Sequence, residues 1–92
     1  MTEDVINNET RQRYELQAGG GIAAVYYEPR GDALAFVHTV VPERLQGQGI
    51  ASALIKAALA DVRRRGLKVI AECQFVVRYI EHHPEERGLL AE

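Results

Sequence analysis

Hydrophobic and polar positions alternate with a period of two in the first part of the chain. Residues 11–17 follow this alternation, which predicts a half-buried edge strand. Residues 22–27 are rich in β-branched and aromatic types, and residues 33–41 are apolar at nearly every position, as in a central strand. Turn-forming residues at 19–21 and 28–32 leave only short connections between these segments. We therefore expect three strands in an antiparallel meander.

The period changes to that of a helix over residues 49–65. Their apolar stripe predicts an amphipathic helix and consists of Ala51, Leu54, Ile55, Ala58, Leu59 and Val62. Residues 67–71 predict a fourth strand, which should lie parallel to the third because a helical crossover separates them. Residues 75–83 predict a second helix that ends at Pro84, and we expect the tail at 85–92 to be loose.

This order of elements, β-β-β-α-β-α, indicates an α+β fold with a mixed four-stranded sheet. The 92 residues fit one small domain, residues 1–92. The net charge of −2 argues against broad nucleic-acid binding. Cys73 is the only cysteine, so no intramolecular disulfide can form and a reducing compartment is expected.

The first residues, 1–4, are acidic, and no apolar run follows them. We therefore expect neither a signal peptide nor a transit peptide. No apolar stretch approaches the roughly 20 residues that are needed to span a bilayer. The sequence thus predicts a cytoplasmic protein without a membrane partner.

Two glycines, Gly47 and Gly49, lie where the third strand gives way to the first helix. Glycine lets the backbone come close to a ligand, and the first turn of a helix presents unpaired N–H groups with a partial positive charge. Together these features predict a pyrophosphate cradle made by the amides of residues 47–52. A simpler interpretation is that the glycines only form a tight strand-to-helix turn.

Two other phosphate-binding motifs can be compared with this turn. A P-loop requires lysine after its last glycine, whereas Ile50 follows Gly49 here. The dinucleotide fingerprint is nearly matched, with Ser52 at its third glycine and Glu72 near the position of the ribose-binding acid. That fingerprint belongs after the first strand of a doubly wound sheet, and only 40 residues follow Ser52. Because the fingerprint is nearly matched, a nucleotide-binding fragment is kept as a third functional hypothesis.

The turn fits the Gln/Arg-x-x-Gly-x-Gly/Ala motif of the GNAT superfamily of N-acetyltransferases with the residues Gln46, Gly47, Gln48, Gly49, Ile50 and Ala51. Residues 38–42, Cys73 and residues 79–84 together resemble a subfamily of very short GNAT-like proteins. The helix, strand and second helix also follow the turn in the family's order. The resemblance covers roughly residues 10–86.

The resemblance implies an N-acetyltransferase that uses acetyl-CoA as co-substrate and an amine as acceptor. Its pyrophosphate would lie against Gln46, Gly47, Gln48, Gly49, Ile50, Ala51 and Ser52. The pantetheine arm would pair with the backbone near Val40 and Val41. The acetyl group would sit where the third and fourth strands splay apart, beside a backbone N–H that polarises the thioester. The alternative is a non-catalytic CoA-binding or regulatory module.

Two residues are candidates for the chemical steps. Tyr79 falls where the family's general-acid tyrosine often lies, so its hydroxyl would protonate the leaving thiolate. Its other interpretation is a core aromatic on an apolar helix face. Cys73 closes the fourth strand near the expected thioester and is a candidate nucleophile through an acetyl-cysteine intermediate. A free cysteine is also commonly just a small buried residue.

Three further residues are candidates by position. His38 lies on the central strand, where it is either a proton relay or a hydrogen-bonded core residue. Glu43 and Glu72 are candidate bases by location alone.

Two basic groups lie at the helix ends. The adjacent pair His82 and His83 lacks the i, i+4 spacing of a metal site, so we predict a helix C-cap and no bound metal. The arginines at 63–65 are expected to be a solvated helix end, with the 3′-phosphate of CoA as an alternative partner.

The chain departs from the GNAT pattern in the parts that normally shape the acceptor pocket. The turn at 19–21 leaves no room for the pair of helices usually found between the first two strands, and the last strands are missing. The acceptor side would then be open to a protein or peptide amine, or completed by a partner subunit. We accordingly expect a monomer or a small homo-oligomer.

Overall fold

A computed structural model describes residues 5–91, so the expectations for residues 1–4 and for Glu92 lie outside the described part. The strands are β1 (Val5–Asn8), β2 (Arg13–Ala18), β3 (Gly21–Arg30), β4 (Ala33–Val40) and β5 (Lys68–Ala71). The helices are α1 (Ile50–Arg64) and α2 (Gln74–His82), with short 3₁₀ segments η1 (Glu43–Leu45) and η2 (Pro84–Leu89). None of the helices described is long and apolar enough to cross a membrane.

The α+β class and the mixed sheet are confirmed, but the sheet has five strands rather than four. The strands lie in the order β1-β2-β3-β4-β5, antiparallel from β1 to β4 and parallel between β4 and β5. Strand β1 escaped the prediction because two asparagines follow its two apolar residues, Val5 and Ile6, which leaves no clear alternation. This segment is a strand because it pairs along β2, where Val5 lies opposite Leu16.

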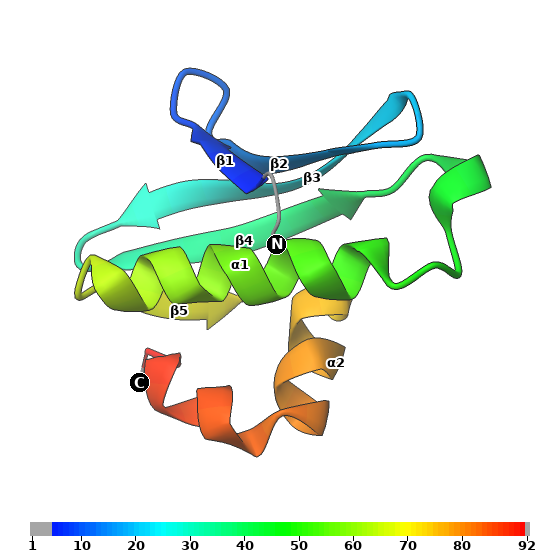
Figure 1. Cartoon of the computed structure of the whole chain (residues 1–92). Coiled ribbons are helices and arrows are strands. Elements are labelled where there is room, and N and C mark those ends of the chain that lie inside the picture. The colour runs from blue at the N-terminus through cyan, green and yellow to red at the C-terminus, as the bar shows by residue number, and fades with distance from the viewer. Residues whose placement is uncertain (1–4, 92) are drawn as a thin grey trace.

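Helix α1 runs across one face of the sheet (Figure 1). Its predicted apolar stripe is buried there from Leu54 to Val62. The sheet contributes three aromatic rings to the same core, with Tyr14 5.4 Å from Tyr27 and 6.1 Å from Phe36 between centroids. Truncating such a buried side chain to alanine typically costs about 2–5 kcal/mol, so this layer holds the helix in place.

A β-bulge in β4 changes which side chains face the helices. Tyr26 pairs with His38 and the next residue, Tyr27, pairs with Phe36, so Val37 is the extra residue. Beyond the bulge, Thr39 is buried opposite Val25, whereas His38 is exposed opposite Tyr26. A regular strand would have put His38 on the helix-covered face with Phe36. His38 is therefore neither a core residue nor on the helix side.

The C-terminal segment is packed, in contrast to the loose tail that we expected. Leu89, at the end of η2, is only 4% exposed and belongs to the core. The N–H of Ala91 donates to the carbonyl of Val69 at 2.8 Å, beside a parallel bridge between Val69 and Leu90. Two leucines in a polar segment gave no periodicity to detect, but they bury apolar surface once the chain turns back.

Candidate functional site

The turn between β4 and α1 depends on two left-handed glycines. Gly47 has φ +81° and Gly49 has φ +76°. A Cβ added at either position would meet no atom within 4 Å, so space is not the reason for glycine. The backbone conformation is the reason, because other L-residues adopt it only with strain.

This turn leaves the first amides of α1 without partners in the helix. The first helical hydrogen bond runs from the Ala53 N–H to the Gly49 carbonyl at 3.0 Å. Gly49 is the N-cap and supplies no side-chain cap, and the first turn contains no acidic residue. The N–H groups of residues 49–52 are thus free to bind an anion, which the helix dipole also favours.

Two glutamine side chains fix the turn by bonding to the backbone behind it. The Gln46 Nε2 donates to the carbonyl of Val41 at 3.1 Å. The Gln48 Nε2 donates to the carbonyl of Arg44 at 3.2 Å. Their local role is therefore to hold the loop, and the Val41 carbonyl already accepts one hydrogen bond.

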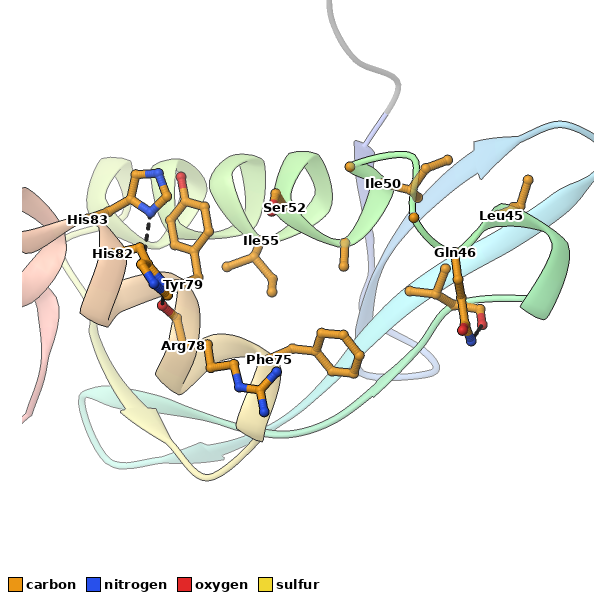
Figure 2. A pocket seen from close by; sticks show the side chains of 14 residues that line it. Leu45, Gln46, Ile50, Ser52, Ile55, Phe75, Arg78, Tyr79, His82 and His83 are labelled. Atoms are coloured by element: carbon orange, nitrogen blue, oxygen red, sulfur yellow. Dashed lines mark hydrogen bonds between the residues drawn. The ribbon is translucent and has the colours of Figure 1, made fainter.

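A pocket of about 670 Å³ opens between the start of α1 and the facing side of α2 (Figure 2). Of the residues predicted to bind the cofactor, it is lined by Val41, Gln46, Gly47, Gly49, Ile50, Ala51 and Ser52. Val40 and Gln48, from the same prediction, do not line it. The volume lies within the usual range of small-molecule sites.

Helix α2 forms the opposite wall of the pocket with a stripe that the sequence did not reveal. Phe75, Arg78, Tyr79 and His82 line it at i, i+3, i+4, i+7 spacing. Phe75 and Val76 are both apolar, but Val76 is fully buried, whereas Phe75 is 48% exposed at the pocket. The spacing was visible in the sequence, but its mixture of aromatic and basic residues did not distinguish pocket from core.

The pocket is electropositive although the chain as a whole carries a net charge of −2. Arg78, His82 and His83 line it, and no aspartate or glutamate among residues 5–91 does. The free amides at the start of α1 add to this positive potential. A pocket of this kind suits an anionic ligand.

Tyr79 lies in the pocket wall under the ring of His83. Their centroids are 3.9 Å apart and the rings are nearly parallel, at 14°. The phenol is only 8% exposed, and burial, helped by Glu86 and Glu85, raises the pKa of Tyr79. Tyr79 therefore stays protonated over a wide pH range and can act as a proton donor. Tyr79 is also part of the core, as its other interpretation has it, and its role as a general acid stays a prediction.

The two histidines at the end of α2 bond to its last carbonyls. His82 Nδ1 lies 2.9 Å from the Arg78 carbonyl oxygen, and His83 Nδ1 lies 2.8 Å from that of Tyr79. This is the C-cap geometry that the sequence predicted. A carbonyl only accepts, so Nδ1 carries the hydrogen on both rings and Nε2 stays available.

Cys73 lies at the point where β4 and β5 separate. The two strands pair only from Ala33 to Phe36 on β4, and the remaining residues of β4 extend past the end of β5. The Cys73 Sγ is 2.9 Å from the Thr39 Oγ1, and the residue is 6% exposed. Cys73 does not line the pocket, whereas Tyr79 does.

The remaining candidates lie away from the pocket. Both oxygens of Glu72 accept from Arg30, at 2.7 and 3.2 Å, and these bonds lower the pKa of Glu72. Neither Glu72 nor Glu43 lines the pocket, so the ribose-binding acid of a dinucleotide site has no counterpart there. His38 is exposed on the uncovered face of the sheet, with its ring centroid 6.0 Å from that of Tyr26.

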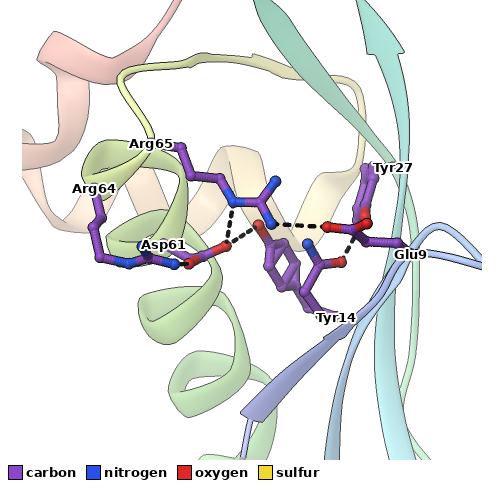
Figure 3. Close-up of polar contacts among 7 residues, drawn as sticks. Glu9, Tyr14, Tyr27, Asp61, Arg64 and Arg65 are labelled. Atoms are coloured by element: carbon purple, nitrogen blue, oxygen red, sulfur yellow. Dashed lines mark hydrogen bonds and ion pairs between the residues drawn. The ribbon is translucent and has the colours of Figure 1, made fainter.

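The arginines at the end of α1 are paired with carboxylates. Arg63 donates to Glu86 at 2.5 Å, and Arg65 to Glu9 at 3.1 Å. Arg64 and Arg65 both pair with Asp61 (Figure 3). None of the three lines the pocket at the other end of the helix.

The mixed sheet, the crossover helix with a glycine turn at its start, and the adjoining pocket define a GNAT-like fold. The sequence profile of the GCN5-related N-acetyl-transferase family matches residues 13–89, and the chain belongs to this family.

Related proteins agree with this assignment. The chain is 31% identical to protein NATD1 of Mus musculus over 83 residues, which are 87% of the chain and 76% of that protein. NATD1 of Homo sapiens is also 31% identical, over 87% of the chain and 74% of that protein. The solution NMR structure of a GCN5-like protein from Staphylococcus aureus superimposes with a TM-score of 0.74. That match has 23% identity, covers 96% of the chain and 87% of the other protein, and supports the fold.

Proposed function

We propose that the protein is an N-acetyltransferase that transfers the acetyl group of acetyl-CoA to an amine. One observation carries the proposal: a single pocket joins the free amides at the start of α1 to the buried hydroxyl-bearing side chain of Tyr79. The first feature binds an anionic coenzyme, and the second supplies a proton to a leaving group.

In this proposal, CoA binds along the predicted positions. The pyrophosphate accepts from the amides of residues 49–52, and the pantetheine arm runs past Val41 toward the end of β4. Gln46 already bonds to the carbonyl of Val41, so the arm uses the remaining backbone groups near Val40. The thioester then lies where β4 and β5 separate.

The acceptor nitrogen attacks the thioester carbon, forms the N–C bond and gives up a proton to solvent. The C–S bond breaks, and the CoA sulfur leaves as a thiolate. Tyr79 donates its proton to that sulfur and recovers one from water. The raised pKa of Tyr79 ensures that the hydroxyl is protonated when the thiolate forms.

A covalent route through Cys73 is the alternative for the same transfer. Its sulfur would take the acetyl group from CoA and pass it to the amine, which restores the thiol. The hydrogen bond between Thr39 and Cys73 holds the sulfur near the strand ends. Since Cys73 is buried and outside the pocket lining, direct attack with Tyr79 as the acid fits the geometry better.

The acceptor side of the protein is open. An open acceptor side fits a large substrate, or a CoA-binding module that catalyses no transfer. Residues 9–12 alone join the first two strands, β1 and β2, and only Gly19 and Gly20 separate β2 from β3, so neither connection is long enough to cover the sheet. Exposed large apolar side chains outside the pocket include Ile6, Ile22 and Val40. We therefore propose a protein or peptide amine as acceptor, with a CoA-binding module without catalysis as the second candidate.

Isothermal titration with acetyl-CoA tests the binding half of the proposal, and we expect saturable binding. No heat of binding at millimolar ligand would refute it.

Release of free thiol in the presence of a panel of amines tests the transfer half. Binding without thiol release for any amine or peptide would leave the non-catalytic module. Stabilisation by NAD but not by CoA in a thermal-shift assay would favour the nucleotide-binding fragment.

A further inference from the structure

Arg78 differs from the arginines at the end of α1 in its surroundings. Arg63, Arg64 and Arg65 each pair with a carboxylate. Arg78 lines the pocket and forms no ion pair with any residue that the structure describes. An arginine without a carboxylate, in a pocket without one, is available for an anion brought by the ligand.

The pocket therefore has two separate positive features on opposite walls (Figure 2). One is the set of free amides at residues 49–52 on α1. The other is Arg78 on α2, with His82 one turn further along the same face. The Nδ1 of His82 is held by the Arg78 carbonyl at 2.9 Å, so a phosphate can accept only from Nε2, and only from the imidazolium form of the ring.

CoA carries two anionic groups that are separated by its ribose. The pyrophosphate matches the helix terminus, which binds phosphate through backbone N–H groups. The second group is the 3′-phosphate, which is absent from dephospho-CoA. A guanidinium binds a phosphate through two parallel N–H···O bonds, which gives this contact both strength and geometry.

We propose that Arg78 and His82 form a subsite for the 3′-phosphate of CoA, so that the pocket selects CoA over dephospho-CoA. The inference rests on the proposed function, because it assumes that CoA is the ligand. In this proposal Arg78 and His82 take the place of the arginines at 63–65, which were the alternative partners of this phosphate in the sequence. Those arginines form ion pairs with carboxylates in the fold. The subsite anchors the nucleotide end of the ligand and takes no part in the transfer.

The test is titration of CoA and of dephospho-CoA into the parent protein and into Arg78→Gln. We expect the parent to bind CoA on the order of tenfold more tightly than dephospho-CoA, and Arg78→Gln to lose this preference. Arg78→Lys should restore part of it, because the charge remains without the planar fork. Arg11→Gln is the matched control, since Arg11 is exposed in the turn between β1 and β2 and the loss of charge is the same.

The outcomes separate the two proposals. Equal weakening of both ligands in Arg78→Gln would overturn the subsite, because Arg78 would then contact the shared part of the molecule. Equal affinity of the parent for both ligands would overturn it as well. Binding of neither ligand would refute the proposed function itself. Circular dichroism and thermal unfolding establish that each variant is folded as the parent is.

Discussion

The two ends of α1 solve the problem of unpaired backbone groups in opposite ways. At its C-terminal end, the last carbonyls accept from the backbone N–H groups of residues 65–67. The Asp61 side chain there accepts from the Tyr14 hydroxyl at 2.7 Å and pairs with Arg64 and Arg65, and Arg65 also pairs with Glu9 (Figure 3). At its N-terminal end, Gly49 offers no side-chain cap and no acid follows in the first turn. One end is saturated by the protein's own groups, whereas the other keeps N–H groups without partners in the helix.

This difference shows where the chain gives up local stability. A serine, threonine or aspartate N-cap would typically add about a few tenths of a kcal/mol relative to glycine. Gly49 forgoes that contribution, and the amides stay directed at the pocket. Regions that sacrifice stability in this way are commonly binding sites, whereas saturated networks are commonly structural. The comparison predicts that matched changes at the two ends affect different properties.

The largest expected effect comes from removing one hydroxyl from the pocket, that of Tyr79, and comparing it with one at the C-terminal end of α1, that of Tyr14. Tyr79→Phe should lower kcat about a hundredfold and leave CoA affinity nearly unchanged, because the proton donor is lost while the ring and its stacking on His83 stay. Tyr14→Phe removes the hydroxyl that bonds to Asp61, and it should lower stability without affecting kcat. Steady-state rates across the pH range measure kcat for both variants, and thermal unfolding measures their stability. Parallel rates for Tyr79→Phe and the parent at every pH would exclude Tyr79 as the acid.

The next effect comes from two glycines with the same left-handed backbone conformation. Gly49 has φ +76° and Gly66, just after α1, has φ +74°, and neither has an atom within 4 Å of an added Cβ. Alanine at either position should cost roughly 1 kcal/mol of stability. Only Gly49→Ala should weaken CoA binding, by about tenfold, since it alters the amides that hold the pyrophosphate. An equal loss of affinity in both variants would mean that strain, not the turn, controls binding.

Asp61→Asn tests the saturated end through its pH dependence. Burial works to raise the pKa of Asp61, but hydrogen bonds from Tyr14 and Arg64 and the nearby arginine charges lower it overall. A lowered pKa in the folded state stabilises the protein above the usual value of 3.8, and this contribution is lost as the pH falls through and below it.

The parent should therefore exceed Asp61→Asn in unfolding free energy by about 1–2 kcal/mol near neutral pH. The difference should shrink below about pH 4. Urea unfolding at a series of pH values measures it. A gap that does not change with pH would show that the charge of Asp61 contributes nothing.

The smallest effect is expected at the surface pair between Arg63 and Glu86. Arg63 is half exposed, so Arg63→Gln should change stability by less than about 0.5 kcal/mol and leave CoA affinity unchanged. Thermal unfolding and titration with CoA measure the two. A clear loss of CoA affinity would instead indicate that the arginines at 63–65 contact the ligand.

The sequence predicted those parts of the fold whose signal is local. The stripe of α1 and the apolar run of β4 repeat over many residues, and both elements form as expected. Strand β1 and the packed tail depend on partners far along the chain, such as Leu16 for Val5 and Val69 for Ala91. The bulge at Val37 likewise arises from pairing with β3 and leaves no mark in the residue pattern.

In the candidate site, too, the parts with a local sequence signal were predicted and the parts that depend on distant contacts were not. The glycine turn is contiguous in the sequence, and most of it lines the pocket. The wall from α2 required the fold, because Phe75 and Val76 are both apolar and only packing decides which one faces the core. Arg78 gave no signal until its lack of a carboxylate partner among residues 5–91 could be compared with the paired arginines. The roles of Tyr79 and Cys73 stay predictions.

The packing of the tail against β5 has a consequence for self-association. Strand β5 is only four residues long and has β4 as its one strand neighbour in the described sheet, so its outer edge would present unpaired backbone groups. The bridge from Leu90 and the hydrogen bond from Ala91 occupy Val69 on that edge. Chains that leave such an edge bare invite a strand from another molecule. Residues 90–91 thus cover part of the β5 edge, where they hinder pairing with a strand from another molecule.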